Sequence, residues 1–206
     1  IFYTLDFAKK NSLFKKIIFS SDSERYLKIA SKYGKFYLHK RNKYSSSSTA
    51  TDLDAFKNFI NDHLKFNNDL PKYFAHLRPT TPIRSKNTVK KALKFFFKKS
   101  KYYSSLRTVN KMSETSFKSL RILNKKLCAI LKKDFNLDKY NKPQKYYPDT
   151  YVANGIIDIY LTSNILKNTL LGKRVLPYVV KDINSDIDTM QDFKYAEYNL
   201  KKRNFN

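Results

Sequence analysis

Two aspartates near the end of the sequence, Asp186 and Asp188, are the first candidates for chemistry. They flank Ile187 in the stretch NSDIDTMQDF. On an extended strand, residues two apart point to the same face, so both carboxylates would converge on one point. Such a pair suits a divalent cation that bridges phosphate oxygens. The same pattern is also typical of a helix cap beside a solvated acid, so the pair alone does not decide between these functions.

The elements around the two aspartates can be predicted from their neighbours. A strand is expected at 174–180, before the pair, and a helix directly after it. Asp188 or Thr189 would cap that helix, and Asp192 would lie in its first turn. The pair is therefore expected at a strand-to-helix junction, where α/β folds place ligands.

Strand and helix patterns alternate along most of the chain, which is typical of a mostly parallel sheet covered by helices. The expected strands are 17–21, 36–39, 72–77, 103–109, 155–161 and 174–180, and the expected helices are 1–10, 22–33, 52–66, 87–99 and 162–168. The alternation is interrupted at 119–131, which has the pattern of a hairpin without an intervening helix. The sequence thus predicts an α/β fold with an inserted hairpin region.

Composition limits the class of protein. The chain has 206 residues, of which 41% are hydrophobic, enough for one sizeable packed domain. No apolar run is long enough to span a membrane, and the start shows no signal-peptide pattern. The single cysteine, Cys128, excludes an internal disulfide and a metal cluster built on cysteines. We therefore expect a soluble, cytoplasmic protein without a membrane partner.

The formal net charge of +25 has two interpretations. A basic protein can bind nucleic acid through phosphate contacts. Here the lysines accompany abundant Asn, Ile, Phe and Tyr along the whole chain, a profile typical of an AT-rich genome, and they concentrate only at 90–99 and 201–203. The distribution favours a solvated lysine-rich surface over a nucleic-acid partner.

The three glycines, Gly34, Gly155 and Gly172, lie far apart, so neither common type of glycine-rich phosphate loop can form within this sequence. The polar stretch 40–51, with its serine run, could be a flexible surface loop or a loop that folds over a nucleotide. A tight loop with two prolines follows at 78–84, with an arginine at each end.

Three of these segments together carry a resemblance. SSDSERYLKIASKYG at 20–34, HLRPTTPIR at 76–84 and NSDIDTMQDF at 184–193 resemble the acylneuraminate cytidylyltransferases in order and spacing, and PDTYVANGIIDIY at 148–160 matches the family's segment before its sugar pocket. These enzymes make CMP-activated sialic acids and their bacterial relatives, legionaminic and pseudaminic acid. The family's first strand and its basic, glycine-containing phosphate loop would precede residue 1.

The resemblance implies a fold and a function. The fold is a three-layer αβα Rossmann-like nucleotidyltransferase with a mostly parallel sheet, in which 1–206 form a single domain and 111–150 a hairpin region that mediates dimerisation. The reaction is transfer of CMP from CTP to the anomeric hydroxyl of a nine-carbon 2-keto sugar acid, with Mg²⁺ as cofactor and release of pyrophosphate, for bacterial surface glycans.

The resemblance also assigns roles to individual residues. The assigned residues are, for catalysis, Asp186, Asp188 and Arg84, with both aspartates as metal ligands; for the nucleotide, Arg41, Thr51, Asp52 and Thr80; and for the sugar acid, Arg78, Thr81, Lys145, Asn154 and Asp158. We expect His39, His63 and His76 to be structural, and no catalytic base stands out.

Departures from the family pattern bear on the substrate. Arg78 replaces a glutamine of the sialic acid enzymes, and Asp158 replaces a tyrosine, both as in the legionaminic-type branch. Gln144-Lys145 stands where the family has an Arg-Gln pair, which displaces one cation by a residue. Two alternatives to an active enzyme remain open at this point: a basic nucleic-acid-binding module and an inactive relative.

Overall fold

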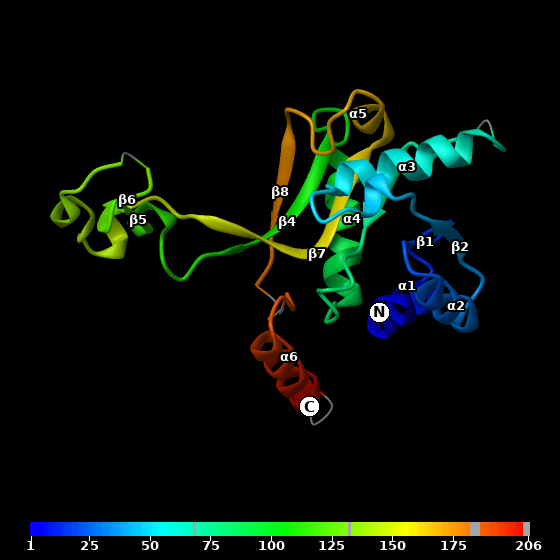
Figure 1. The fold of residues 1–206 in the computed structure, drawn as a ribbon, viewed down its shortest axis with the longest axis horizontal. Coiled ribbons are helices and arrows are strands. Elements are labelled where there is room, and N and C mark those ends of the chain that lie inside the picture. The colour runs from blue at the N-terminus through cyan, green and yellow to red at the C-terminus, as the bar shows by residue number, and fades with distance from the viewer. Residues whose placement is uncertain (68, 132, 182–185, 204–206) are drawn as a thin grey trace.

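The computed structural model describes residues 1–67, 69–131, 133–181 and 186–203 (Figure 1). The helices are α1 (Phe2–Lys10), α2 (Glu24–Tyr33), α3 (Asp52–Leu64), α4 (Lys86–Lys99), α5 (Thr162–Leu166) and α6 (Met190–Arg203). The strands are β1 (Ile18–Ser21), β2 (Tyr37–Lys40), β3 (Tyr73–His76), β4 (Ser105–Lys111), β5 (Leu120–Leu123), β6 (Lys126–Ala129), β7 (Tyr151–Leu161) and β8 (Val175–Val179). The expected helices and strands are confirmed with small shifts at their ends, except that β7 begins four residues before the strand expected at 155–161.

The central sheet has four strands in the order β3-β7-β4-β8. Strands β4 and β8 are parallel, whereas β7 runs antiparallel to both of its neighbours, β3 and β4. The prediction of a mostly parallel sheet is therefore wrong for this part, and the sheet is mixed. The reason lies in the connection: residues 112–150 join β4 to β7 without a crossover helix, and a return of that kind places the second strand antiparallel to the first.

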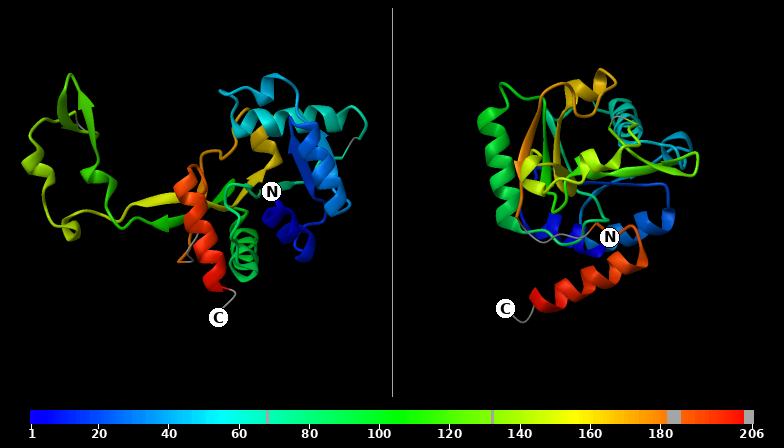
Figure 2. Two further views of the ribbon diagram at one scale, coloured as in Figure 1. Left: turned by 60° about the horizontal axis from the view of Figure 1, so that its bottom comes forward. Right: turned by 90° about the vertical axis from the view of Figure 1, so that its left-hand side faces the viewer.

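Helices cover both faces of this sheet, as expected for a three-layer arrangement (Figure 2). On one face α4 buries Val89, Ala92 and Phe96 against apolar residues of β4, β7 and β8. On the other face α3 packs Phe59 and Ile60 against Phe74 of β3 and Tyr160 of β7. Because side chains alternate along a strand, Ile157 and Ile159 face α4, while Asp158 and Tyr160 face α3.

Strands β1 and β2 form a separate parallel pair. Ile18 of β1 joins the cluster beneath α3, and the His39 ring of β2 hydrogen-bonds Asp62 of α3 at 3.2 Å between Nε2 and Oδ2. Helix α3 thus connects this pair to the central sheet. Within the described residues β1 does not pair with β3.

Residues 112–150 form an arm that leaves the body of the molecule at the ends of β4 and β7 (Figures 1 and 2). It contains the hairpin β5-β6, whose turn residues Asn124 and Lys125 both have positive φ, as a tight two-residue hairpin turn requires. The predicted hairpin is therefore confirmed. Several large apolar side chains of the arm remain exposed, among them Ile122, Leu127, Leu131 and Phe135.

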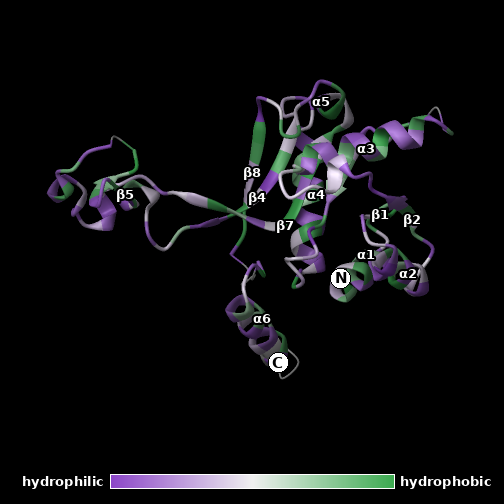
Figure 3. Cartoon of the chain, in the orientation of Figure 1, coloured by the Kyte–Doolittle hydropathy of each residue, from purple (hydrophilic) through white to green (hydrophobic). Residues whose placement is uncertain are grey.

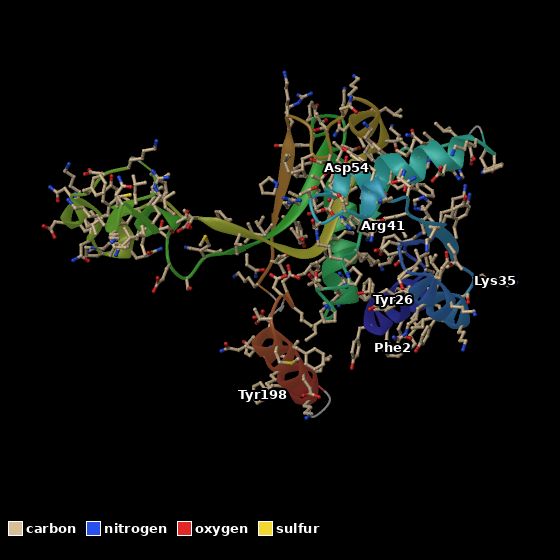
Figure 4. All side chains as sticks on the ribbon, in the orientation of Figure 1. Phe2, Tyr26, Lys35, Arg41, Asp54 and Tyr198 are labelled. Carbon is tan, nitrogen blue, oxygen red and sulfur yellow. The ribbon has the colours of Figure 1, made fainter. Side chains whose placement is uncertain are left out.

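At the other end of the chain, α6 lies beside the body and carries Tyr198 on its surface (Figure 4). Apolar and polar residues alternate around α4 and α6, as amphipathic surface helices require (Figure 3). None of the described helices has the length and apolar character needed to cross a bilayer.

Candidate active site

The loop between β3 and α4 forms one wall of the candidate site. Its turn closes with a hydrogen bond from the Thr81 amide to the Arg78 carbonyl at 3.2 Å, and Ser85 then caps α4 by accepting from the Thr88 amide. The two prolines restrict φ on either side of the threonines, which makes the loop rigid. As a result, Thr80 is exposed at the tip while Thr81 is fully buried against its neighbours.

Arg84 anchors this loop from below. Its guanidinium donates to the carbonyls of Ile156, Gly155 and Arg78 and to the Thr4 hydroxyl. Burial lowers its pKa to about 10, and the charge of Arg78 contributes in the same direction. All of these hydrogen bonds are therefore made to acceptors within the protein. The structure places Arg84 beneath the loop that carries the threonines, as a residue that positions them.

The two aspartates lie in an irregular segment before α6. Residues 186–189 are not part of a strand, so the expected convergence of Asp186 and Asp188 along an extended strand is wrong. The expected helix does follow. Thr189 caps it by accepting from the Asp192 amide, and Asp192 accepts in return from the Thr189 amide at 2.8 Å. Because this capping box uses Thr189 and Asp192, the Asp188 carboxylate plays no part in it.

The tertiary structure brings the loop and the aspartates together. The Thr81 hydroxyl donates to Asp186 Oδ1 at 3.3 Å, and the Ile187 amide donates to the Thr80 carbonyl at 2.9 Å. Both Asp186 and Asp188 are exposed. The aspartate segment is thereby held against the two threonines of the loop. These contacts unite two of the four sequence segments that were singled out, 76–84 and 184–193.

A bulge in β7 supports the same contact. Gly155 has φ of +67°, and the pairing of β7 with β4 shifts register in this region. A Cβ on Gly155 would lie 2.3 Å from Thr81 Oγ1, so only glycine lets Thr81 approach this closely. Next to it, the Asn154 amide group donates to Asn110 Oδ1 at 2.7 Å. Thr81, Gly155 and Asn154 are thus neighbours, as expected for residues of one site.

Asp158 lies deeper, on the face of the sheet below α3. Its carboxylate accepts from Arg78 Nη1 at 2.8 Å, from Arg107 Nε and Nη2 at 3.2 and 3.0 Å, and from the Tyr160 hydroxyl at 3.0 Å. Burial would raise the pKa of Asp158, but the hydrogen bonds from Arg107 and Arg78 outweigh it and lower the pKa. Asp158 is therefore a charged carboxylate that the protein itself neutralises.

Arg107 was not among the candidate residues predicted from the sequence. A usable signal existed: Arg107 and Asp158 are each a single charged residue inside an apolar strand, in SLRTV and GIIDIYL. Opposite charges in two buried strands are expected to form an ion pair, because an unpaired buried charge is costly. The register confirms this, since Arg107 lies directly opposite Asp158.

The predicted nucleotide residues divide into two groups. Asp52 joins the site through an ion pair with Arg78 Nη2 at 2.6 Å, and the adjacent Thr51 uses its hydroxyl in the capping box of α3 with Asp54. Arg41, labelled in Figure 4, follows β2 and pairs with Asp22 at 3.2 Å. Among the described residues, no hydrogen bond or ion pair joins Arg41 to the Arg78–Asp186 group.

Arg41 nevertheless has unused hydrogen-bonding capacity. Its Nε is buried and has no partner within the described part of the chain. The polar loop that follows is ordered rather than loose: Asn58 of α3 accepts from the Asn42 amide and from the Ser45 hydroxyl, each at 2.8 Å. The loop is therefore held in place over the end of β2, next to Arg41.

Lys145 lies apart from the other sugar-acid candidates. It lines a groove at the root of the arm, together with Lys111, Met112, Ser113, Gln144, Tyr147 and Asp149. None of the other predicted site residues lines this groove. Within the described part of one chain, Lys145 thus does not contact the loop that carries Thr80 and Thr81.

The histidines have structural surroundings. His39 bonds Ser20 and Asp62, and His63 bonds the Asp69 carbonyl at 3.0 Å. His76 packs edge-on against Phe56, and burial together with the charge of Arg78 lowers its pKa to about 4. Each ring thus has a partner within the fold, in line with the structural role expected from the sequence.

The residues present fit a magnesium ion. Among the described residues no group of three or more histidine, cysteine, aspartate or glutamate side chains could enclose a metal. Mg²⁺ does not need such an enclosure, because one or two carboxylates, water and substrate phosphates commonly bind it. Asp186 and Asp188 are exposed, oxygen-bearing and close in sequence, which matches that donor set.

Comparison with known proteins finds sequence similarity to sugar-acid cytidylyltransferases. No family model matches it. It is 30% identical to the N-acylneuraminate cytidylyltransferase of Escherichia coli O18:K1:H7 over 208 residues, which cover 98% of this chain and 46% of that enzyme. It is 25% identical to a pseudaminic acid cytidylyltransferase of Campylobacter jejuni, over 96% of this chain and 83% of that protein. The chain is a distant homologue of the acylneuraminate cytidylyltransferases.

Solved structures support the fold. A CMP:2-keto-3-deoxy-manno-octonic acid synthetase, complexed with CTP, matches 98% of this chain and 88% of that one with a TM-score of 0.66 at 10% identity. A 4-diphosphocytidyl-2C-methyl-D-erythritol synthase from Anaerococcus prevotii matches 97% of this chain and 87% of that one with a TM-score of 0.58 at 15% identity. The chain therefore has the α/β nucleotidyltransferase fold, with a mixed sheet and a small hairpin. It spans about half the length of the Escherichia coli relative.

Proposed function

We propose that this chain is a cytidylyltransferase that transfers CMP from CTP to the anomeric hydroxyl of a nonulosonic acid and releases pyrophosphate. The observation that carries the proposal is the contact of Thr81 with Asp186, since it assembles the loop and the aspartates that the resemblance singles out. Homology to the N-acylneuraminate and pseudaminic acid enzymes over nearly the whole chain supports the same reaction class.

Asp186 and Asp188 would hold Mg²⁺ in this reaction. When bound, the ion neutralises charge that develops on the phosphates during transfer. Thr81 contributes by donating to Asp186, which orients that carboxylate, and Arg84 contributes by holding the loop on which Thr81 lies. Phosphoryl-type transfer depends mainly on positioning and charge stabilisation, so this set of residues needs no covalent intermediate.

The remaining predicted residues are proposed as ligands of the two substrates. Arg41, Thr80 and the start of α3 at Thr51 and Asp52 would face the nucleotide. Arg78 would face the sugar acid, while Thr81 and Asn154, which are buried, would shape the wall of its site. The legionaminic-type branch is the proposed class, because Arg78 and Asp158 resemble the residues of that branch. Arg78 supports this assignment physically, since a guanidinium forms charge-assisted hydrogen bonds with a carboxylate.

We also propose that the chain forms a homodimer through its arm. Residues 112–150 expose Ile122, Leu127, Leu131 and Phe135 in a segment that has little contact with the body (Figure 1). Exposed apolar groups gathered in this way favour association, because burying them removes apolar surface from water. In a dimer Lys145 could then serve the partner's site, which would explain its separation from the other candidates.

The decisive experiment is a pyrophosphate-release assay with CTP, Mg²⁺ and a panel of acids: N-acetylneuraminate, pseudaminic acid, legionaminic acid and 2-keto-3-deoxy-manno-octonic acid. We expect release with at least one nine-carbon acid and little release when UTP or ATP replaces CTP. Asp186→Asn and Asp188→Asn should each lower the rate about 100-fold or more, since each removes a metal ligand.

Asp192, four residues after Asp188, offers a matched control. Asp192→Asn removes the same charge, but from the α6 capping box, so it should lower thermal stability slightly and leave the rate per folded molecule within about twofold. Absence of pyrophosphate release with every acid would reject the proposed reaction. An unchanged rate for Asp186→Asn would reject the metal assignment alone.

A further inference from the structure

Three neighbouring strands present one cross-strand row of polar residues on the face below α3. His76 of β3, Asp158 of β7 and Arg107 of β4 lie directly opposite one another. Arg78, two residues beyond His76, reaches the same carboxylate. The row therefore gathers two guanidiniums around one buried acid, in a sheet whose other positions on these strands are mainly apolar.

The buried acid cannot serve as a substrate ligand itself. Asp158 is only 1% exposed, and both of its oxygens accept hydrogen bonds from Arg78, Arg107 or Tyr160. A carboxylate in this state has neither the surface nor the lone pairs to receive another donor. Its effect is to fix the two guanidiniums, because the Arg107 contact uses two nitrogens and therefore sets both the position and the plane of that group.

The arginine pair adjoins the loop that holds the aspartates. A Cβ placed on Gly155 would lie 3.8 Å from Arg78 Cδ and 2.3 Å from Thr81 Oγ1, so both side chains pass over the same glycine. Thr81 in turn contacts Asp186. The structure thus forms one continuous path of contacts from the proposed metal ligands through Thr81 and Arg78 to Arg107.

The two guanidiniums retain capacity for a further anion. Asp158 and Asp52 together balance the two guanidinium charges, but the Asp52 side chain is 44% exposed, so a substrate carboxylate can compete with it for Arg78. The Arg107 side chain is 28% exposed, and its hydrogen bonds to Asp158 use Nε and Nη2 but not Nη1. A planar guanidinium edge that is fixed in place and partly exposed is well suited to a carboxylate.

We infer that Arg107, together with Arg78, binds the carboxylate of the acceptor sugar acid, and that Asp158 is a positioning residue that orients the two guanidiniums. This inference rests on the proposed function, because only a 2-keto sugar acid acceptor brings a carboxylate next to the hydroxyl group that receives the CMP. It replaces the expected direct contact of Asp158 with substrate by an indirect role, and it adds Arg107 to the acceptor site.

The test compares each acid of the panel with its methyl ester, which keeps the sugar and removes the carboxylate charge. Binding is measured by calorimetry without CTP, and KM and kcat by pyrophosphate release with CTP. The wild-type chain should favour acid over ester at least tenfold. Arg107→Gln should weaken acid binding about 10- to 100-fold while changing ester binding less than twofold, with kcat at saturating acid within about threefold.

Three further variants define the mechanism. Arg107→Lys should keep part of the acid preference that Arg107→Gln loses, since lysine keeps the positive charge but not the planar guanidinium group. Asp158→Asn should reduce the acid preference by freeing both arginines to reorient, and it should raise KM for the acid more than it lowers kcat. Arg174→Gln, which removes an exposed arginine just before β8, should leave the acid preference unchanged.

The outcomes separate this inference from the function on which it rests. If the wild-type chain turns over an acid but Arg107→Gln weakens acid and ester equally, or weakens neither, the carboxylate assignment is wrong and the proposed reaction stands. If no acid is turned over but acids still bind with the expected dependence on Arg107, the reaction is wrong and the carboxylate site stands. Absence of acid binding by the wild-type chain overturns the inference directly.

Discussion

The hydroxyl of Thr81 donates a hydrogen bond to Asp186 Oδ1 at 3.3 Å across 105 residues of sequence. The contact depends on two further features. Gly155 leaves room for Thr81 by lacking a Cβ, and Arg84 holds the loop from below through carbonyls of β7 and of the loop itself. The proposed metal site is therefore set by the packing of a loop against a strand bulge.

Gly155→Ala should destabilise the fold strongly. The new Cβ would meet Thr81 Oγ1 at 2.3 Å, and the backbone φ of +67° disfavours any side chain. We expect a loss of about 2–5 kcal/mol in the free energy of unfolding, measured by urea titration. The double variant Gly155→Ala/Thr81→Ala should recover part of this loss, because it removes the clash but keeps the strained φ.

Gly34→Ala is the matched control for that substitution. Gly34 has an extended backbone, with φ of 172°, and its nearest contact would be the Phe36 ring at 3.2 Å. The cost should stay below about 1 kcal/mol, since an aromatic ring at the surface can shift slightly. Equal costs at the two glycines would contradict the role given to the Thr81 contact.

Arg84→Lys should lower the stability of the fold, and not only the rate of turnover. Lysine keeps the charge but cannot reach the Ile156 and Arg78 carbonyls and the Thr4 hydroxyl together. We expect a loss of about 2–4 kcal/mol in unfolding free energy. Arg25→Lys, at an exposed position on α2, should cost less than about 0.5 kcal/mol. A variant with an unchanged melting temperature and abolished turnover would show instead that Arg84 touches substrate.

Stability should fall with acidification through His76. Burial, and the charge of Arg78 next, lower the folded-state pKa to about 4, whereas the unfolded value is near 6.5. The unfolded state therefore binds the proton more readily, and stability is lost as pH falls from about 6.5 to about 4. His76 lies near Asp52, Asp158, Arg78 and Arg84. The pKa of Arg84 lies at about 10, that of Arg78 is raised and that of Asp158 is lowered, so none of these three groups titrates within this window.

The replacement His76→Phe isolates this contribution. The ring keeps its packing against Phe56 and Tyr160 but cannot bind a proton. Unfolding free energies of wild type and variant, measured by urea titration at pH 7 and pH 4, should differ in their pH dependence by up to about 3 kcal/mol, with the wild type more sensitive. Parallel pH profiles would show that His76 titrates normally in the fold.

Asn58→Ala should loosen the polar loop after β2. It removes the acceptor of the Asn42 amide and of the Ser45 hydroxyl, at a cost of about 1–3 kcal/mol for the buried groups left unpaired. Trypsin should then cleave after Lys43 several times faster. Asn61→Ala, one turn further along α3 on its exposed side, is the control and should leave cleavage unchanged. Equal cleavage rates in both variants would mean that Asn58 does not order the loop.

Much of the fold could be predicted from the chain alone, because local patterns determine local structure. The helix expected from residue 52 corresponds to α3, and the alternation at 119–131 indicated the hairpin. The direction of β7 could not be predicted in this way. The antiparallel orientation follows from the route of residues 112–150, and no local pattern encodes the path of an arm.

The candidate site likewise combines features that local sequence determines with features that depend on the tertiary structure. The sequence by itself determined which residue types were available: two aspartates two apart, a rigid loop with two threonines, and a lone glycine in a strand. Only the tertiary structure decided their roles. It buried Arg84 and Asp158 among protein partners, set Arg107 opposite Asp158, and left Asp186 and Asp188 exposed. Burial and pairing arise from contacts between distant strands, so the free energy of a charged group is decided by the fold that surrounds it.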